Sequence, residues 1–376
     1  MDAVRQIADA VLYEGYVLWP YRRSALKNRQ RWTFGGIYPR GHSLGRDDDP
    51  WRMRTECLLI GDEDARVDVG VRFLQVVHRQ VMQASANGFR PVDELTVAGE
   101  RHLSWEEAIE REVGVEGVRV GELAKWPRRL KISVPRGEAH EDLHDHPGPD
   151  TETQVSDAIR PKLGSQRGAA ASPGARAPAG AIVRRWHRLD GCVEIGAARL
   201  PIAATQRSTG VDPARSLFRV TVRVVNTTPW HGGSREQAVE RALCSAHAVL
   251  HVEQGKFVSL TDPPDELRAA AEACRNDGVW PVLVGEPGDR STVLASPIIL
   301  EDHPRIAPES PGDLFDGGEI DQLLTLNILS LTDAEKDEMR ASDPRAREIL
   351  ERTEALSEEE LMRLHGTIRD FRQVRG

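Results

Sequence analysis

Two groups of histidines are the first candidates for chemistry in this sequence. His140, His144 and His146 alternate with carboxylates in the segment HEDLHDH. Imidazole and carboxylate groups at this spacing are ligands for zinc, nickel or copper, so the segment is a candidate divalent-metal site. The alternative is a solvated tract, because a flexible loop loses conformational entropy when it orders its ligands. We favour the solvated tract.

The second group consists of Cys244, His247 and His251, with His231 as a candidate fourth ligand. On a helix, steps of three and four residues place the first three side chains on one face, where they could hold a metal ion. However, the segment AVLHV has strand character, and a strand would turn His251 away from the other two. We therefore favour a buried cysteine and two hydrogen-bonded histidines over a metal site.

A basic, aromatic-rich arm is the third candidate. Between positions 15 and 46 the sequence has seven basic residues and no acidic one. Alternating rings and cations can dock an acidic protein or stack on nucleic-acid bases, whereas the alternative is that the rings fill the core and the guanidinium groups stay in solvent. A protein partner is favoured over nucleic acid because no nucleic-acid-binding motif accompanies the arm. The residues predicted to bind the partner are Arg22, Arg23, Lys27, Arg29, Arg31 and Trp32.

The known catalytic motifs are missing from the sequence. It has no nucleophile elbow, no His-Glu-x-x-His and no kinase motif, and the turn 285–288 is followed by a strand pattern rather than by a phosphate-binding helix. Active sites can be dispersed in sequence, so an enzymatic role stays open. A binding role is favoured, and we name no catalytic residue.

Composition and charge place the chain in a broad class. Its 376 residues contain no apolar run of the length of about 20 that crosses a bilayer, and the N-terminus does not resemble a secretory signal. The four cysteines are scattered without a Cys-x-x-Cys pair, which indicates reduced thiols. We expect a cytoplasmic protein without a membrane anchor. The net charge of −9 argues against tight non-specific binding to nucleic acid.

The hydrophobic periodicity predicts an α+β protein. Alternating segments indicate an antiparallel β-sandwich-like unit that is interrupted by a disordered insertion and followed by a small α/β part and a C-terminal bundle of short helices. From position 309 to the end there are 17 acidic and nine basic residues, so the last module is acidic. The predicted units are an N-terminal helix and basic aromatic arm (1–50), an antiparallel β unit (51–135 and 181–230), a disordered loop or linker (136–180), an α/β part (231–305) and an acidic helical module (306–376).

Local signals set the expected turns and helix starts. The turn GDEDA predicts a hairpin between segments 55–60 and 67–77, and Asp190-Gly191 predicts another between 182–189 and 192–199. Gln254-Gly255 predicts a turn between strands 248–253 and 256–260. Four capping boxes predict helix starts, of which the second would begin a helix that ends near residue 248. The boxes are Ser104 with Glu107, Ser234 with Gln237, Thr332 with Glu335, and Ser357 with Glu360.

Three stretches together resemble a known group of proteins. WPYRRSALKNRQRW, SPGDLFDGGEIDQLLTLNILSLTDAEKDEM and DPRAREILERTEALSEEELMRLHG are similar to uncharacterised proteins encoded beside actinobacterial-type, high-affinity uptake NiFe-hydrogenases. The resemblance spans most of the chain and implies an accessory or maturation role, through binding of a hydrogenase subunit or another assembly factor. It supplies no catalytic residue. We therefore expect a non-enzymatic protein-binding factor, with a metal-binding protein or metal-dependent enzyme that uses a histidine cluster as the alternative.

Overall fold

The computed structural model describes residues 2–14, 35–145, 177–201, 216–304 and 331–342, together with 347, 350, 351 and 353–355. Its central element is β1 (Arg52–Ser85), a strand of 34 residues. β1 is long enough to pair with different neighbours along its length, all of them antiparallel. Those neighbours are β10 (Ser216–Asn226), β11 (Cys244–Val258), β5 (Trp105–Arg119), β8 (Gly180–Trp186) and β2 (Gly88–Val92).

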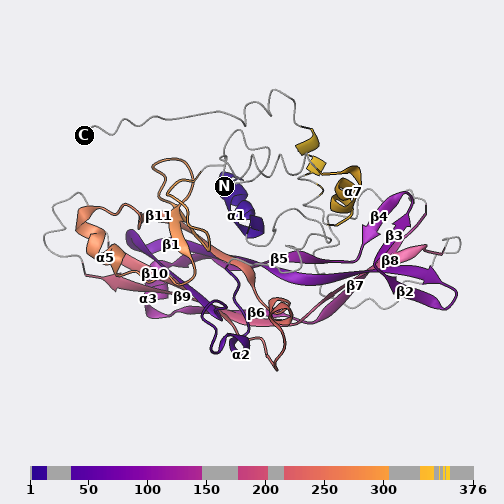
Figure 1. Cartoon of the computed structure of the whole chain (residues 1–376). Coiled ribbons are helices and arrows are strands. Elements are labelled where there is room, and N and C mark those ends of the chain that lie inside the picture. Colours follow the sequence, from indigo (N-terminus) through magenta and orange to yellow (C-terminus); the bar gives the residue numbers. More distant parts are fainter. Residues whose placement is uncertain are drawn as a thin grey trace.

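The remaining strands extend this sheet on both sides of β1 (Figure 1). The main path runs β12-β13-β11-β1-β10-β9-β6, and β7 pairs with β8. In the described part of the chain, 11 strands belong to this sheet, and two more form a separate pair, β3–β4. The bounds are β3 (Glu94–Val97), β4 (Glu100–Leu103), β6 (Arg128–Val134), β7 (Gly137–Leu143), β9 (Leu189–Leu200), β12 (Trp280–Leu283) and β13 (Thr292–Ser296).

This architecture agrees with the expected α+β class and its antiparallel strands, but it changes the expected division into units. The strands on both sides of β1 are hydrogen-bonded into one sheet, whereas a sandwich would join them as two. The predicted α/β part at 231–305 is not separate either, since β11, β13 and β12 continue the same sheet. β11 pairs with β1, and β13 and β12 follow it in the sheet.

Short helices cover parts of the sheet. The capping box of α4 is present, with the Ser234 backbone N–H donating to Gln237 Oε1 at 3.1 Å. The box of α7 is present too, with the Thr332 N–H donating to Glu335 Oε2 at 2.8 Å. The helices are α1 (Asp2–Glu14), α2 (Arg40–Ser43), α3 (Val120–Lys125), α4 (Arg235–Val239), a 3-10 turn (Asp265–Leu267), α5 (Arg268–Glu272) and α7 (Asp333–Ser342). No helix among the described residues has the length and apolar character required to cross a membrane.

The core follows from the period-two pattern of β1. In VDVGVRF, alternate residues point to one face of the sheet, so Val69, Val71 and Phe73 are buried in the main core. The opposite face carries Leu74 and Val76, which pack against α4 and against Leu12 of α1. β1 is therefore buried on both faces over this stretch. That burial fixes its register, because a slip of one residue would exchange the two sets.

Two predicted turns are absent because β1 and β11 stay paired across them. Gly61 pairs with Gly255 and Arg66 pairs with Glu253, so GDEDA is an irregular bulge within β1 rather than a hairpin turn. On the opposite strand, Gln254 takes a φ of 63° without reversing the chain. Both predictions of a hairpin are wrong for the same reason: each strand continues along the same partner.

The turn predicted at Asp190-Gly191 is also wrong. β8 pairs with β1 and β7, whereas β9 pairs with β10 and β6, so the two strands diverge. Gly191 lies within β9, where a Cβ would stand 2.7 Å from the carbonyl oxygen of Val225. Here glycine permits close approach of two strands. Similarly, Ser104 begins no helix, because its Oγ accepts from the Val81 N–H at 2.9 Å and β5 starts at the next residue.

The segment predicted to be disordered is partly a strand. Residues 137–143 form β7, which pairs with β8 from Gly137 opposite Trp186 to Leu143 opposite Gly180. Charged side chains join the strands, since Arg184 donates to Glu141 at 2.6 Å. Most side chains of β7 are exposed, which agrees with the polar composition of residues 137–143. Residues 146–176 lie outside the described part, as does most of the predicted acidic helical module.

Candidate functional site

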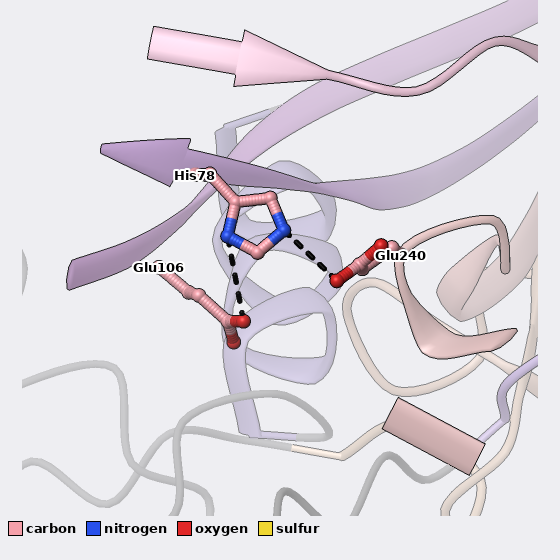
Figure 2. A group of neighbouring side chains, drawn as sticks. All are labelled: His78, Glu106 and Glu240. Carbon is pink, nitrogen blue, oxygen red and sulfur yellow. Dashed lines mark hydrogen bonds and ion pairs between the residues drawn. The ribbon is translucent and has the colours of Figure 1, made fainter. Parts of the chain in front are cut away.

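One histidine and two glutamates from separate elements meet on the face of β1 that carries α4. Figure 2 shows the imidazole of His78 between the carboxylates of Glu106 and Glu240. His78 Nε2 lies 2.9 Å from Glu240 Oε1, and His78 Nδ1 lies 3.6 Å from Glu106 Oε1. Glu106 is on β5, and Glu240 follows the last residue of α4. The three side chains form the cluster that we call the His78 site.

Strand register brings the first two residues together. His78 of β1 is directly opposite Glu106 of β5, and such cross-strand neighbours have Cβ atoms about 5 Å apart. Glu240 is brought to the site because α4 packs on the sheet. Ala238 and Val239 of α4 pack on the same cluster as Val76, which precedes His78 by two residues and therefore shares its face. The apolar side of α4 thus sets the position of the carboxylate that follows it.

A second histidine and an arginine extend the His78 site. His187, in the connection between β8 and β9, has its Nε2 3.0 Å from Glu240 Oε2. Arg241 donates to the same oxygen at 3.3 Å and lies 3.2 Å from His187 Nδ1. The backbone carbonyl of His187 accepts a hydrogen bond of 2.8 Å from the buried side chain of Gln75. This bond fixes the loop that carries the second imidazole.

The charges in the site are mutually compensated. Burial raises the pKa of Glu240. The hydrogen bond to His78 and the charges of His78, His187 and Arg241 outweigh this effect, so the pKa of Glu240 lies below its ordinary value. Burial and the charge of Arg241 lower the pKa of His187. An ionised carboxylate therefore stands beside an imidazole that favours its neutral form. These are the protonation states in which both groups coordinate metals.

The arrangement has the chemistry of a metal site. Among the described residues, His78, Glu106 and Glu240 are the group of metal-ligating side chains whose ligand atoms all lie within 4.8 Å of one another. Imidazole nitrogen and carboxylate oxygen together suit divalent transition ions. The His78 and Glu106 side chains are 42% and 38% exposed, so an ion can reach them from solvent. Glu240 is the more enclosed ligand, with 16% of its side chain exposed.

The histidines singled out in the sequence are not brought together. Cys244, His247 and His251 lie on β11 instead of a helix, and the last two are separated by about 13 Å along a strand at 3.3 Å per residue. Cys244 is buried against α1, and His247 is fully buried with its Nδ1 3.1 Å from the Ser245 carbonyl oxygen. His251 Nδ1 lies 3.0 Å from Thr292 Oγ1, and His231 is exposed. The favoured alternative fits Cys244 and His251, whereas His247 makes a hydrogen bond through Nδ1 and its buried Nε2 has no partner among the described residues.

The other sequence candidates are exposed or lie outside the described residues. His140 is an exposed residue of β7 with its Nε2 2.5 Å from Glu138 Oε1, and His144 follows the end of that strand. His146 and the six arm residues are outside the described part: Arg22, Arg23, Lys27, Arg29, Arg31 and Trp32. The partner-binding prediction for the arm therefore stays a prediction.

A buried ion-pair network anchors the loop before β1 to α4. Asp49 is 3% exposed and lies 2.9 Å from His42 Nε2, while Arg235 of α4 donates to both of its carboxylate oxygens at 3.1 Å. Burial raises the pKa of Asp49, but the hydrogen bonds from Arg235 and His42 outweigh it and lower the pKa overall. Arg235 also donates to Tyr38 Oη at 2.7 Å. The network fixes the start of α4, the helix that positions the His78 site.

No signal in the sequence marks the residues of the His78 site. His78 and Glu240 are 162 positions apart, and neither belongs to a recognisable motif. Comparison with models of protein families finds no match to this chain, and comparison with curated proteins finds no significant match.

Proposed function

We propose that this chain is a non-enzymatic accessory protein that binds a divalent metal ion through His78, Glu106 and Glu240. The observation that carries the proposal is the convergence of three ligand groups, from β1, β5 and the end of α4, within 4.8 Å. Each ligand is held by a different part of the fold, so the geometry depends on the folded state.

The link to NiFe-hydrogenase maturation is supported by the sequence resemblance, and the protein partner by the basic arm at positions 15–46. A metal-binding accessory protein is consistent with this resemblance, which implies a role in the maturation of a nickel–iron enzyme. In this proposal the arm contacts the partner and the His78 site holds the ion. The arm can be tested separately, because Arg22→Ala with Arg23→Ala should weaken capture of the partner at low salt without changing metal binding.

Calorimetric titration of the untagged protein with zinc and with nickel tests the metal site. We expect one ion per chain, and we expect His78→Ala to weaken binding at least ten-fold because it removes the imidazole that contacts both carboxylates. His140→Ala is the matched control, since His140 is an exposed histidine on the same sheet with one carboxylate beside it. Circular dichroism should show that both variants are folded. Equal affinities for wild type and the His78 variant would refute the proposal.

A further inference from the structure

We propose that the sheet edge formed by β6 (Arg128–Val134) and β7 (Gly137–Leu143) pairs with the same edge of a second copy of this chain. The two copies would run antiparallel about a two-fold axis, which is the commonest symmetry of protein dimers. No residue of the His78 site lies on β6 or β7, so this dimer goes beyond the proposed function and does not depend on metal binding.

β6 and β7 together form one continuous edge of the sheet. Val134 of β6 pairs with Leu189 of β9. Three positions later, Gly137 of β7 pairs with Trp186 of β8, which is three positions earlier than Leu189. The register is therefore unbroken across the two-residue connection between the strands. At about 3.4 Å per residue, the edge extends for about 50 Å from residue 128 to residue 143.

This edge is open along its outer side in the described part of the chain. There, β6 has β9 as its strand partner, and β7 has β8. An edge of this kind presents a row of backbone N–H and C=O groups that can pair with another strand. Addition of a strand to a sheet edge is a common mode of protein association.

The two halves of the edge carry opposite charges, and this order of charges identifies the occupant. β6 has basic residues and no acidic one, whereas β7 has acidic residues and no lysine or arginine. In an antiparallel dimer, the basic half of each copy faces the acidic half of the other. An acidic peptide would match β6 alone, and a basic peptide would match β7 alone. The charged residues are Arg128, Arg129 and Lys131 on β6, and Glu138, Glu141 and Asp142 on β7.

The register that is centred on Pro135 matches these charges residue by residue. With Pro135 of both copies at the axis, Arg128 is opposite Asp142 of the second copy, and Arg129 is opposite its Glu141. The symmetry repeats both pairs on the other side of the axis. Opposite charges that face each other across two strands stabilise their pairing. Pro135 has no backbone N–H, so residues on either side of it would make the hydrogen bonds between the copies.

Ion pairs within the chain leave these side chains accessible to a second copy. Arg129 contacts Glu194 of β9, yet 74% of the Arg129 side chain is exposed. Glu141 accepts from Arg184 of β8 at 2.6 Å, and 51% of the Glu141 side chain is exposed. In the dimer, Arg129 would lie between Glu194 and Glu141 of the second copy. The charges would then alternate across four neighbouring strands.

Reversal of charge on each half of the edge tests the dimer by sedimentation equilibrium of untagged protein at concentrations up to about 100 µM. One variant combines Arg128→Glu with Arg129→Glu, and the other combines Glu141→Arg with Asp142→Arg. We expect wild type to dimerise and each variant alone to dimerise at least ten-fold more weakly, because like charges then face each other. An equimolar mixture of the two variants should form dimers again, since an acidic edge then faces a basic one.

A matched control and a second measurement accompany the charge reversals. Arg90→Glu with Arg268→Glu changes the net charge equally at two exposed positions outside the edge and should leave dimerisation unchanged. Pro135→Cys places one thiol per copy at the axis, so a mild oxidant should link the two copies through a disulfide. Ser85→Cys, at the exposed end of β1, should not cross-link. Circular dichroism establishes that each variant is folded.

Three outcomes would overturn the proposal. The first is a wild-type protein that stays monomeric at the highest concentration. The second is a dimer whose affinity is the same in wild type and in both edge variants. The third is a mixture of the two variants that stays monomeric while the Pro135→Cys protein does not cross-link. Dimerisation that is lost in each variant and restored on mixing supports it.

Discussion

Protonation of His247 should cost this protein stability in mildly acidic solution. The imidazole is fully buried on β11 (Cys244–Val258), opposite Arg72 of β1, and its Nε2 has no hydrogen-bond partner among the residues that the structure describes. Burial is the main reason that its pKa falls from 6.5 to about 4, and the charge of Arg72 lowers it further. The folded chain therefore keeps His247 neutral at pH values at which the unfolded chain protonates it.

The size of the effect follows from this difference in pKa. Above pH 6.5 the residue is neutral in both states and contributes no pH dependence. As the pH falls from 6.5 towards 4, the unfolded state takes up a proton and the folded state does not, so the free energy of unfolding decreases. The full difference corresponds to about 3 kcal/mol, of which about 2 kcal/mol is lost between pH 7 and pH 5. Below about pH 4 the contribution is constant.

Comparison with His247→Leu isolates this contribution from the other groups that titrate. Urea unfolding of both proteins at several pH values, followed by tryptophan fluorescence, gives the two free energies of unfolding. The wild-type value should fall by about 2 kcal/mol more than the variant value between pH 7 and pH 5. His144→Leu, which replaces an exposed histidine, should follow wild type. Parallel curves for wild type and His247→Leu would show that the reasoning is wrong.

Two further substitutions test the packing of the fold by urea unfolding. Asp49→Ala should lower the free energy of unfolding by about 3 kcal/mol, because it leaves His42 buried without its carboxylate. Asp48→Ala, at the exposed neighbouring position, should change it by less than about 0.5 kcal/mol, and similar losses in both variants would contradict this interpretation. Gly191→Ala should cost about 1–3 kcal/mol, because the new Cβ meets the Val225 carbonyl oxygen at 2.7 Å. An unchanged midpoint would contradict the close approach of these strands.

The sequence predicts a strand well where the alternation of apolar and polar residues is clear. The prediction fails where the structure of a segment depends on pairing with a strand that is distant in the sequence. The clean alternation of LFRVTVRVVN predicts a strand at 217–226, and β10 spans Ser216–Asn226. In contrast, the polar segment GDEDA has the composition of a turn, yet it is a bulge within β1, because β11, almost two hundred positions later, pairs with β1 on both sides of it. Composition reports what a segment can do in isolation, and the partner strand decides between a turn and a bulge.

The helix predicted beyond Ser234 shows the same limit. The capping box is correct because it depends on two residues that are three positions apart. The end of the helix is wrong, since the chain leaves α4 after Val239 and joins the sheet at Cys244. Ser245 takes a φ of 51° there, at a register shift opposite β1. Pairing with the central strand outweighs the helical spacing of the segment.

The His78 site could not be found from the sequence for a related reason. His78 and Glu106 become neighbours only through the register of β1 and β5, and Glu240 joins them only when α4 docks on the sheet. The histidine-rich segment near His140 was a candidate metal site because its histidines and carboxylates lie close together in the sequence. Adjacency along an exposed strand, however, points alternate side chains to opposite faces.

The length of β1 has a consequence for the order of events during synthesis. Leu58 pairs with Arg219 of β10 and with Val258 of β11, both far along the chain, and Val258 is synthesised long after Leu58. Until β11 has been synthesised, the edge of β1 that will pair with it has backbone N–H and C=O groups without partners. Such an edge can pair with another chain. Assembly dominated by such distant pairs is slow. This edge of β1 therefore stays open to association until β11 has been synthesised.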